Sequence, residues 1–189
     1  MEPDKITINP APQENFAKEI VKFTLIALAI VIPIRLYVAQ PFIVSGASMD
    51  PTFKSNQYLI VDQLTYHFNE PQREDVIVFR YPRDPSTFFI KRIIGLPGES
   101  VKLHDGIVTI INKEYPQGID IDDSHIIPTH KTADNFSVTL GDKEYFVLGD
   151  NRPESSDSRS WGPLEKKYIM GRPFVRLFPF NKIGFFPGK

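Results

Sequence analysis

The feature that most constrains the fold is a series of short apolar segments between residues 58 and 148. Each segment is rich in β-branched and aromatic residues and is followed by a cluster of Pro, Gly, Asp or Asn. This pattern predicts short strands joined by tight turns, as in an antiparallel sheet. The segments are 58–61, 76–81, 88–94, 107–111, 138–140 and 145–148. We therefore predict a mainly β domain, with a short helix or turn only at residues 165–170.

A second constraint is an apolar segment near the N-terminus. Residues 23–34 carry no charge and are bounded by Lys22 and Arg35. If these two side chains extend toward opposite headgroup layers, residues 20–40 form a helix of about 20 residues and roughly 30 Å, which matches a hydrocarbon core. The predicted organisation is a flexible tail over 1–17, a single transmembrane anchor over 18–40, and a β-rich domain over 41–189 with a loop-rich insertion at 112–137.

Three other interpretations of the apolar segment remain open: a buried core helix, a helix lying in the membrane interface, and a cleaved signal peptide. The last is disfavoured because the small residues Ala27 and Ala29 lie in the middle of the segment rather than after it. Lysine and arginine residues flank the segment almost equally, so charge does not determine its orientation.

Composition excludes several function classes. The net charge of -1 and the pI of about 6.4 come without any basic cluster, which argues against a nucleic-acid partner. The chain has no cysteine, which excludes disulfides and thiolate chemistry. The four histidines, His67, His104, His125 and His130, do not have the spacing of metal ligands. We predict neither a metal nor a cofactor.

Two stretches contain residues suited to catalysis. Ser48 follows Gly46 and Ala47 and precedes Pro51, a sequence that predicts a turn open to a substrate backbone. A serine hydroxyl needs a base within hydrogen-bonding distance, and the candidate is Lys91, which lies in an apolar run. Burial lowers a lysine pKa, and a decrease from about 10.4 to about 8 corresponds to roughly 3 kcal/mol. Taken singly, these residues would be a turn serine and an exposed strand lysine.

A third stretch, residues 149–159, begins with Gly-Asp-Asn-Arg and contains Ser155, Asp157 and Arg159. Together with residues 45–52 and 89–99, in this order, it resembles the type I signal peptidases. The resemblance implies a membrane-bound serine endopeptidase that removes N-terminal signal peptides from exported preproteins, cutting after an Ala-x-Ala site through an acyl-enzyme. It also implies a β-sheet domain on the extracytoplasmic side of the cell membrane, next to one transmembrane helix.

The resemblance assigns a role to each matching residue. Ser48 attacks the scissile carbonyl, and Lys91 takes its proton and later protonates the leaving amine. Ser155 hydrogen-bonds Lys91 and orients it, while Asp157 and Arg159 form a buried ion pair that supports this loop. Asp150, Asn151 and Arg152 are expected to have a supporting role as well.

One position departs from the family pattern. Gly46 stands where some members have a serine whose hydroxyl helps to hold the oxyanion, so the Ser48 backbone N–H is the donor that remains expected. The resemblance also implies two shallow pockets for small side chains of an extended peptide. The first is expected to be lined by Val44, Met49, Phe53 and Phe89, and the second by Phe42, Leu59, Val78 and Ile90. Plain core packing is the alternative interpretation for all eight residues.

The predicted partners are signal peptides, the lipid bilayer and the protein translocation machinery. Three other identities remain open. The first is a self-cleaving Ser/Lys protease that resembles the SOS repressors, although an apolar segment occupies the space where those proteins carry a DNA-binding domain. The second is a membrane-anchored β domain that binds exported chains without cutting them. The third is an organellar member of the same peptidase family.

Overall fold

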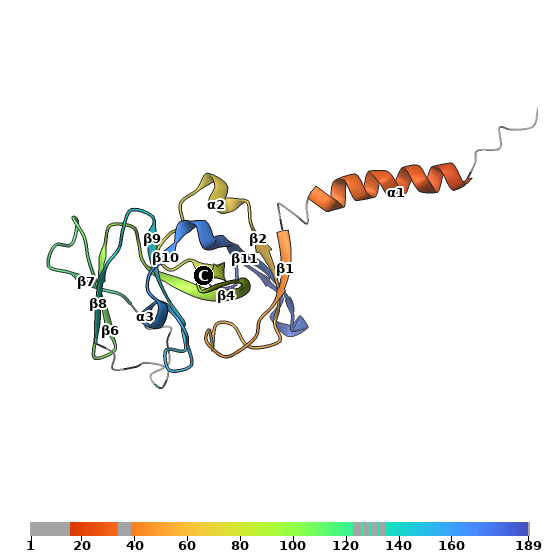
Figure 1. Ribbon diagram of the computed structural model, residues 1–189. Helices are drawn as coiled ribbons and strands as arrows, with labels where there is room; N and C mark the ends of the chain where they lie inside the picture. The colour runs from red at the N-terminus through yellow and green to blue at the C-terminus, as the bar shows by residue number, and fades with distance from the viewer. Residues whose placement is uncertain are drawn as a thin grey trace, which may run out of the picture.

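The computed structural model describes residues 16–33, 39–122, 126, 129, 132 and 135–188. It contains one N-terminal helix, α1 (Phe16–Pro33), and a β domain that begins at residue 39 (Figure 1). Most of the predicted tail, residues 34–38 of the predicted anchor, and His125 and His130 lie outside the described residues.

The larger sheet has eight strands, and its strand pairs are antiparallel. Seven strands follow one another in the order β1-β2-β11-β3-β4-β9-β10, and β12 pairs with β11. Their bounds are β1 (Ala39–Ile43), β2 (Tyr58–Asp62), β3 (Val76–Tyr81), β4 (Asp84–Gly95), β9 (Glu144–Leu148), β10 (Leu164–Glu165), β11 (Ile169–Phe178) and β12 (Gly184–Phe185).

The smaller sheet has four strands in the order β7-β6-β5-β8 and lies at the far end of the β domain from α1 (Figure 1). The strands are β5 (Ser100–His104), β6 (Ile107–Ile111), β7 (Ile119–Asp120) and β8 (Phe136–Thr139). The short helices of the domain are α2 (Thr65–Phe68), α3 (Ser158–Trp161), η3 (Lys166–Tyr168) and η4 (Phe180–Lys182).

Three clusters of buried side chains form the core. One lies between the two sheets, at the junction of β5, β6 and β9. A second packs β3, β4 and β9 together around Phe79 and Tyr145. The third, which matters most for the site, consists of Val44, Met49, Phe53, Leu59 and Val76. It anchors the segment between β1 and β2 onto the sheet.

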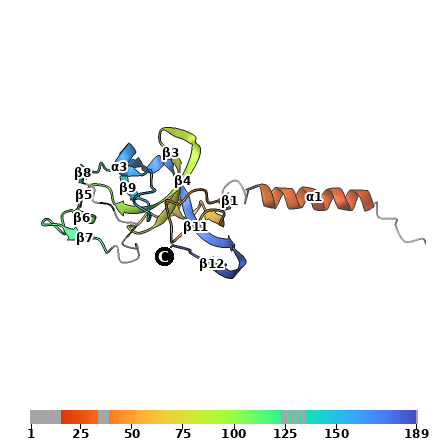
Figure 2. The same cartoon turned by 90° about the horizontal axis from the view of Figure 1, so that it is seen from below.

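Helix α1 has no buried residue, and it projects away from the β domain in both views (Figures 1 and 2). Within the residues that the structure describes, no helix combines the length and the apolar character needed to cross a bilayer.

The prediction of a mainly antiparallel β domain is confirmed. The strand expected at 138–140 begins earlier, at Phe136, and β1, β5, β7, β10, β11 and β12 were not among the predicted strands. The predicted anchor extends too far, because residues 39–40 belong to β1 and pair with β2. Residues 165–170 contain the single turn η3 and then the first two residues of β11. Strand β11 could not be predicted from the sequence pattern because it contains Gly171 and Pro173, which usually mark turns. Both residues lie next to register shifts in the pairing of β11 with its neighbours.

Candidate active site

The turn after β1 presents Ser48 at the surface of the domain. Two backbone hydrogen bonds of 2.9 Å, Val44 N–H to the Gln57 carbonyl and Asn56 N–H to the Val44 carbonyl, fix the start of the turn. The side chains of Met49 and Phe53 are 1% and 0% exposed and hold the turn from below. Ser48 therefore lies on a rigid support although it belongs to an irregular segment.

Gly46 allows the chain to enter this turn. Its φ of 91° is a left-handed conformation that non-glycine residues rarely adopt. A Cβ at this position would meet nothing within 4 Å, so the conformation, rather than crowding, favours glycine here. No described residue accepts a hydrogen bond from the backbone N–H of Ser48.

Strand β4 carries Lys91 to the same place. The Nζ atom of Lys91 lies 2.8 Å from Ser48 Oγ and 3.0 Å from the carbonyl oxygen of Ile90. The residue is only 4% exposed, and this burial lowers the pKa of Lys91 to about 8, against the opposing effect of the Asp157 and Asp150 carboxylates. A lysine with this pKa is partly neutral near neutral pH and can accept a proton there.

The loop over residues 149–159 closes onto the serine turn from the other side. The Asn151 backbone N–H donates to the Ser48 carbonyl at 3.0 Å, and Asn151 Nδ2 donates to the Ala47 carbonyl at 3.2 Å. Gly149 permits this approach, because a Cβ there would overlap both the Ser48 carbonyl oxygen and Ser155 Oγ.

A buried ion pair shapes the same loop. Asp157 is fully buried and receives two hydrogen bonds of 2.8 Å from the Arg159 guanidinium. It also accepts from the Gly149 backbone N–H at 3.1 Å. Arg159 in turn donates to the Arg152 carbonyl at 2.6 Å. The pair thus connects the beginning of the loop to its end.

Ser155 does not make the hydrogen bond to Lys91 that the sequence predicts. Its Oγ atom is buried and has no hydrogen-bond partner among the residues that the structure describes. The Nζ atom of Lys91 hydrogen-bonds Ser48 Oγ and the Ile90 carbonyl. Ser155 is nevertheless close to the nucleophile turn, since its Oγ and the Ser48 carbonyl both border the missing Cβ of Gly149.

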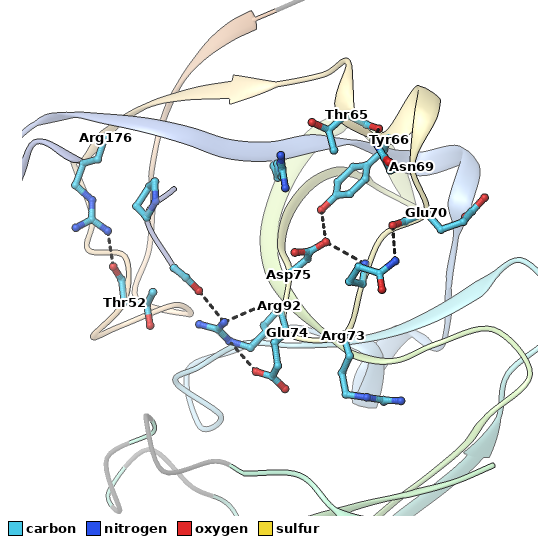
Figure 3. Close-up of a pocket in the computed structure, with 14 residues that line it drawn as sticks. Thr52, Thr65, Tyr66, Asn69, Glu70, Arg73, Glu74, Asp75, Arg92 and Arg176 are labelled. Carbon is cyan, nitrogen blue, oxygen red and sulfur yellow. Dashed lines mark hydrogen bonds and ion pairs between the residues drawn. The ribbon is translucent and has the colours of Figure 1, made fainter. Parts of the chain in front are cut away.

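A second ion pair supports the serine turn from behind. Arg92 donates to both carboxylate oxygens of Asp150, at 2.9 and 2.8 Å, and Thr52 Oγ1 donates to the same carboxylate at 2.5 Å. Arg176 binds the Thr52 carbonyl at 2.7 Å (Figure 3). Thr52, Arg92 and Arg176 border a cavity of about 1090 Å³ that is lined mainly by charged and polar side chains and includes neither Ser48 nor Lys91.

A smaller groove of about 240 Å³ lies beside Ser48 and Lys91. The end of β1 forms one wall and β4 the other. Six of the eight predicted pocket residues line it: Phe42, Val44, Leu59, Val78, Phe89 and Ile90. Met49 and Phe53 do not, and their prediction is wrong in this respect, because both side chains turn down into the core beneath the turn.

Several residues outside the eight predicted pocket residues also line the groove. Ile43, Phe88, Glu154 and Ser156 all contribute to its lining. The rings of Phe42 and Phe88 meet edge to face at 5.2 Å, which brings the two walls together at one end of the groove. Phe88 could have been predicted, because it lies two residues before Ile90 and alternate residues of a strand point to the same face. Nothing in the sequence indicates that the loop residues Glu154 and Ser156 face the groove.

No three His, Cys, Asp or Glu side chains in the described ranges lie close enough together to hold a metal ion. The site therefore consists of a serine hydroxyl, a buried lysine amine, a backbone amide and a mostly apolar groove. Such a set can carry out acyl transfer, with the hydroxyl as nucleophile and the amine as base.

Known proteins are similar to this chain over most of its length. The family model described as "Signal peptidase, peptidase S26" matches residues 17–178. A probable signal peptidase I-1 from Synechocystis is 35% identical over 93% of this chain and 89% of its own length. A signal peptidase I from Leptolyngbya laminosa is 38% identical over 84% of this chain and 78% of its own. Another, from Bacillus licheniformis, is 31% identical over 90% and 94%.

Proposed function

Since this chain belongs to the signal peptidase family, peptidase S26, and is a serine peptidase of the signal peptidase I type, we propose that it removes signal peptides from exported preproteins through a Ser48/Lys91 dyad. The observation that carries this proposal is the 2.8 Å separation of Ser48 Oγ from a buried lysine amine whose pKa is lowered to about 8.

The reaction begins when the neutral amine of Lys91 takes the proton from Ser48 Oγ. The oxygen then attacks the scissile carbonyl carbon and forms a tetrahedral intermediate. As the C–N bond breaks, the Lys91 ammonium gives its proton to the leaving amine, and the signal peptide remains as an ester of Ser48. A water molecule, deprotonated by Lys91, attacks this ester, and the returning proton restores the serine hydroxyl.

The hydrogen-bonding capacity of Lys91 gives Ser155 a role in this scheme. A neutral amine has one lone pair and two N–H groups. The lone pair is needed for the Ser48 hydroxyl, and one N–H bonds to the Ile90 carbonyl. The second N–H requires another acceptor, and the buried Ser155 Oγ has no hydrogen-bond partner in the structure. We assign Ser155 the role of positioning residue for the neutral amine, reached by rotation of its side chain.

The oxyanion requires at least one donor at the nucleophile. The Ser48 backbone N–H is suited to this role because no described residue accepts a hydrogen bond from it. A single such donor typically contributes about 3 to 4 kcal/mol to the stabilisation of the transition state. Since Gly46 offers no hydroxyl, the second donor is a water molecule or a backbone amide.

The groove fits an extended peptide that adds a strand between β1 and β4. Its lining is mainly aliphatic and aromatic, and its volume is about 240 Å³. Alternate residues of an extended peptide point the same way, so the first and third residues before the cut enter the groove. This supports cleavage after an Ala-x-Ala site.

We further propose that the apolar helix α1 attaches the protein to a membrane, with the β domain on the extracytoplasmic side. Large apolar side chains lie exposed around α1, and nothing in the β domain covers them. On the β domain, Phe180 and Phe185 are 78% and 70% exposed, at η4 and β12. Both views show β12 on the side from which the chain leaves toward α1 (Figures 1 and 2), where aromatic residues would meet the lipid interface.

The experiment that tests the function uses a preprotein with an Ala-x-Ala site and the enzyme in detergent with phospholipid. Wild type is expected to cut after the final alanine, as mapped by mass spectrometry. Ser48→Ala and Lys91→Ala should each abolish the cut, and Lys91→Arg should fail as well, because a guanidinium does not act as a base at this pH. The matched control is Lys102→Ala, at an exposed lysine on β5.

Two outcomes would contradict the proposal. A folded Lys91→Ala protein that cuts at a near-normal rate would exclude the dyad. Folded wild type that binds the preprotein without cutting it would favour a domain that captures exported chains. Membrane attachment is tested separately by extraction of membranes at alkaline pH, from which an attached protein remains in the pellet.

A further inference from the structure

The substrate groove contains one acidic side chain, that of Glu154, among its mostly apolar lining. Glu154 is exposed, and its carboxylate makes no hydrogen bond or ion pair with the part of the chain that the structure describes. The only basic side chain in the lining is Lys91, which is directed toward Ser48 and the Ile90 carbonyl. A negative charge thus borders the place where a preprotein is cut.

The position of Glu154 relative to the nucleophile is fixed by its backbone. Its N–H donates to the Asn151 carbonyl at 3.2 Å, which closes a four-residue turn. The N–H of Asn151 donates to the Ser48 carbonyl at 3.0 Å. Two hydrogen bonds therefore connect the Glu154 main chain to the Ser48 main chain. The main chain of Glu154 is thus connected to the nucleophile turn, and its side chain lines the same groove as Ser48 and Lys91.

We propose that Glu154 is a specificity-determining residue that favours a basic side chain of the preprotein within two residues of the cleaved bond. The pockets that take small side chains are apolar and serve the first and third residues before the cut. The residue between them points away from the pockets, and the residues after the cut pass beyond Ser48. A side chain at these positions is not held in an apolar pocket, so a long, flexible lysine or arginine there can extend toward the exposed Glu154 carboxylate at the groove. An acidic side chain at the same positions would be repelled.

This inference rests on the proposed function and concerns its substrate. An exposed ion pair contributes about 0.2 to 1 kcal/mol, which corresponds to a preference of roughly 1.5- to 5-fold in kcat/KM. The preference should weaken with added salt, because a pair at the mouth of the groove is screened.

The test uses a set of peptides with one Ala-x-Ala site that carry Lys, Gln or Glu at the second position before the cut or at the first or second position after it. For each enzyme we compare kcat/KM of the Lys and Glu peptides with that of the Gln peptide. Wild type should prefer Lys over Glu at one of these positions. Glu154→Gln should reduce the ratio of kcat/KM for the Lys peptide to that for the Glu peptide to about 1, and Glu154→Lys should bring this ratio below 1. Glu114→Gln, at an exposed glutamate outside the groove, is the matched control and should keep the wild-type ratio.

The possible results separate this inference from the proposed function. If wild type cuts all the peptides at rates independent of their charge, the specificity inference is overturned and the peptidase function remains. If the Lys preference of wild type persists in both Glu154 variants, another group is responsible and the inference is again overturned. If wild type cuts none of the peptides or the parent preprotein, the proposed function fails and this inference fails with it.

Discussion

The burial of Lys91 should make the protein less stable at neutral pH than a variant without the charge. The pKa of this lysine falls from 10.5 to about 8 on folding, because burial disfavours the ammonium form. The folded state therefore holds the proton less tightly than the unfolded chain. Below about pH 8, burial of the Lys91 ammonium lowers the free energy of unfolding by the full amount, which is roughly 3 kcal/mol. Between about pH 8 and 10.5 unfolding takes up a proton, so stability rises with pH and this destabilisation is removed.

Lys91→Met tests this reasoning, because methionine has a similar unbranched shape and no charge. The variant loses the hydrogen bonds from Nζ to Ser48 Oγ and to the Ile90 carbonyl, worth about 1 kcal/mol each, so the net gain at pH 7 should be about 1 kcal/mol. For a chain of this size that corresponds to a Tm higher by roughly 2 to 4 °C. Lys102→Met, at an exposed lysine, should change stability by less than about 0.5 kcal/mol.

The assay is equilibrium urea unfolding of wild type and both variants in detergent at pH 7 and pH 10. Wild type should gain roughly 2.5 kcal/mol relative to Lys91→Met between the two pH values, because only wild type loses the buried charge. Other titrating groups are shared by the two proteins and cancel in this difference. If Lys91→Met is less stable than wild type at pH 7, or if the difference does not change with pH, the reasoning is refuted.

Three further predictions follow from the same contacts. With a fluorogenic peptide, kcat/KM should rise about tenfold per pH unit below pH 8 and level off above it, because only the neutral amine of Lys91 is a base. A pH profile of kcat/KM that is flat from pH 6 to 9 would contradict this prediction. Arg92→Met leaves the Asp150 carboxylate buried without this partner and should lower the free energy of unfolding by about 3 to 5 kcal/mol in urea titrations. Gly149→Ala forces a Cβ against the Ser48 carbonyl and should lower kcat more than any stability loss explains, whereas the same change at Gly98, which faces open space, should leave kcat unaltered.

The sequence predicted those parts of the molecule that depend on local composition. Runs of β-branched and aromatic residues predicted β3 within its exact bounds, and the apolar neighbours of Lys91 predicted that its side chain is buried. Contacts between segments far apart in the chain could not be predicted from local composition. Met49 and Phe53 are apolar residues near the nucleophile, as pocket residues are, but composition does not distinguish a residue that faces the groove from one that faces the core. That distinction depends on the path of the turn after Gly46, which only the structure gives.

The loop residues show a second limit of sequence reasoning. The resemblance to a family predicted a contact from Ser155 to Lys91, yet the structure leaves Ser155 Oγ without a partner. Whether a hydroxyl meets an amine depends on a side-chain rotation and on the protonation of the amine, and the sequence encodes neither directly. Glu154 escaped notice for a related reason: its place beside the groove depends on the turn that Asn151 closes against Ser48.

The two buried ion pairs influence the chemistry of Lys91 as well as the shape of the loop. Asp157 and Asp150 both act to raise the pKa of Lys91, which would keep the amine protonated and unable to act as a base. Each carboxylate, however, is held by a guanidinium through two hydrogen bonds, Asp157 by Arg159 and Asp150 by Arg92. The arginine charges offset the carboxylate charges at the lysine, so burial remains the dominant effect. An unpaired carboxylate at either position would stabilise the ammonium form of Lys91 and shift the onset of activity to higher pH.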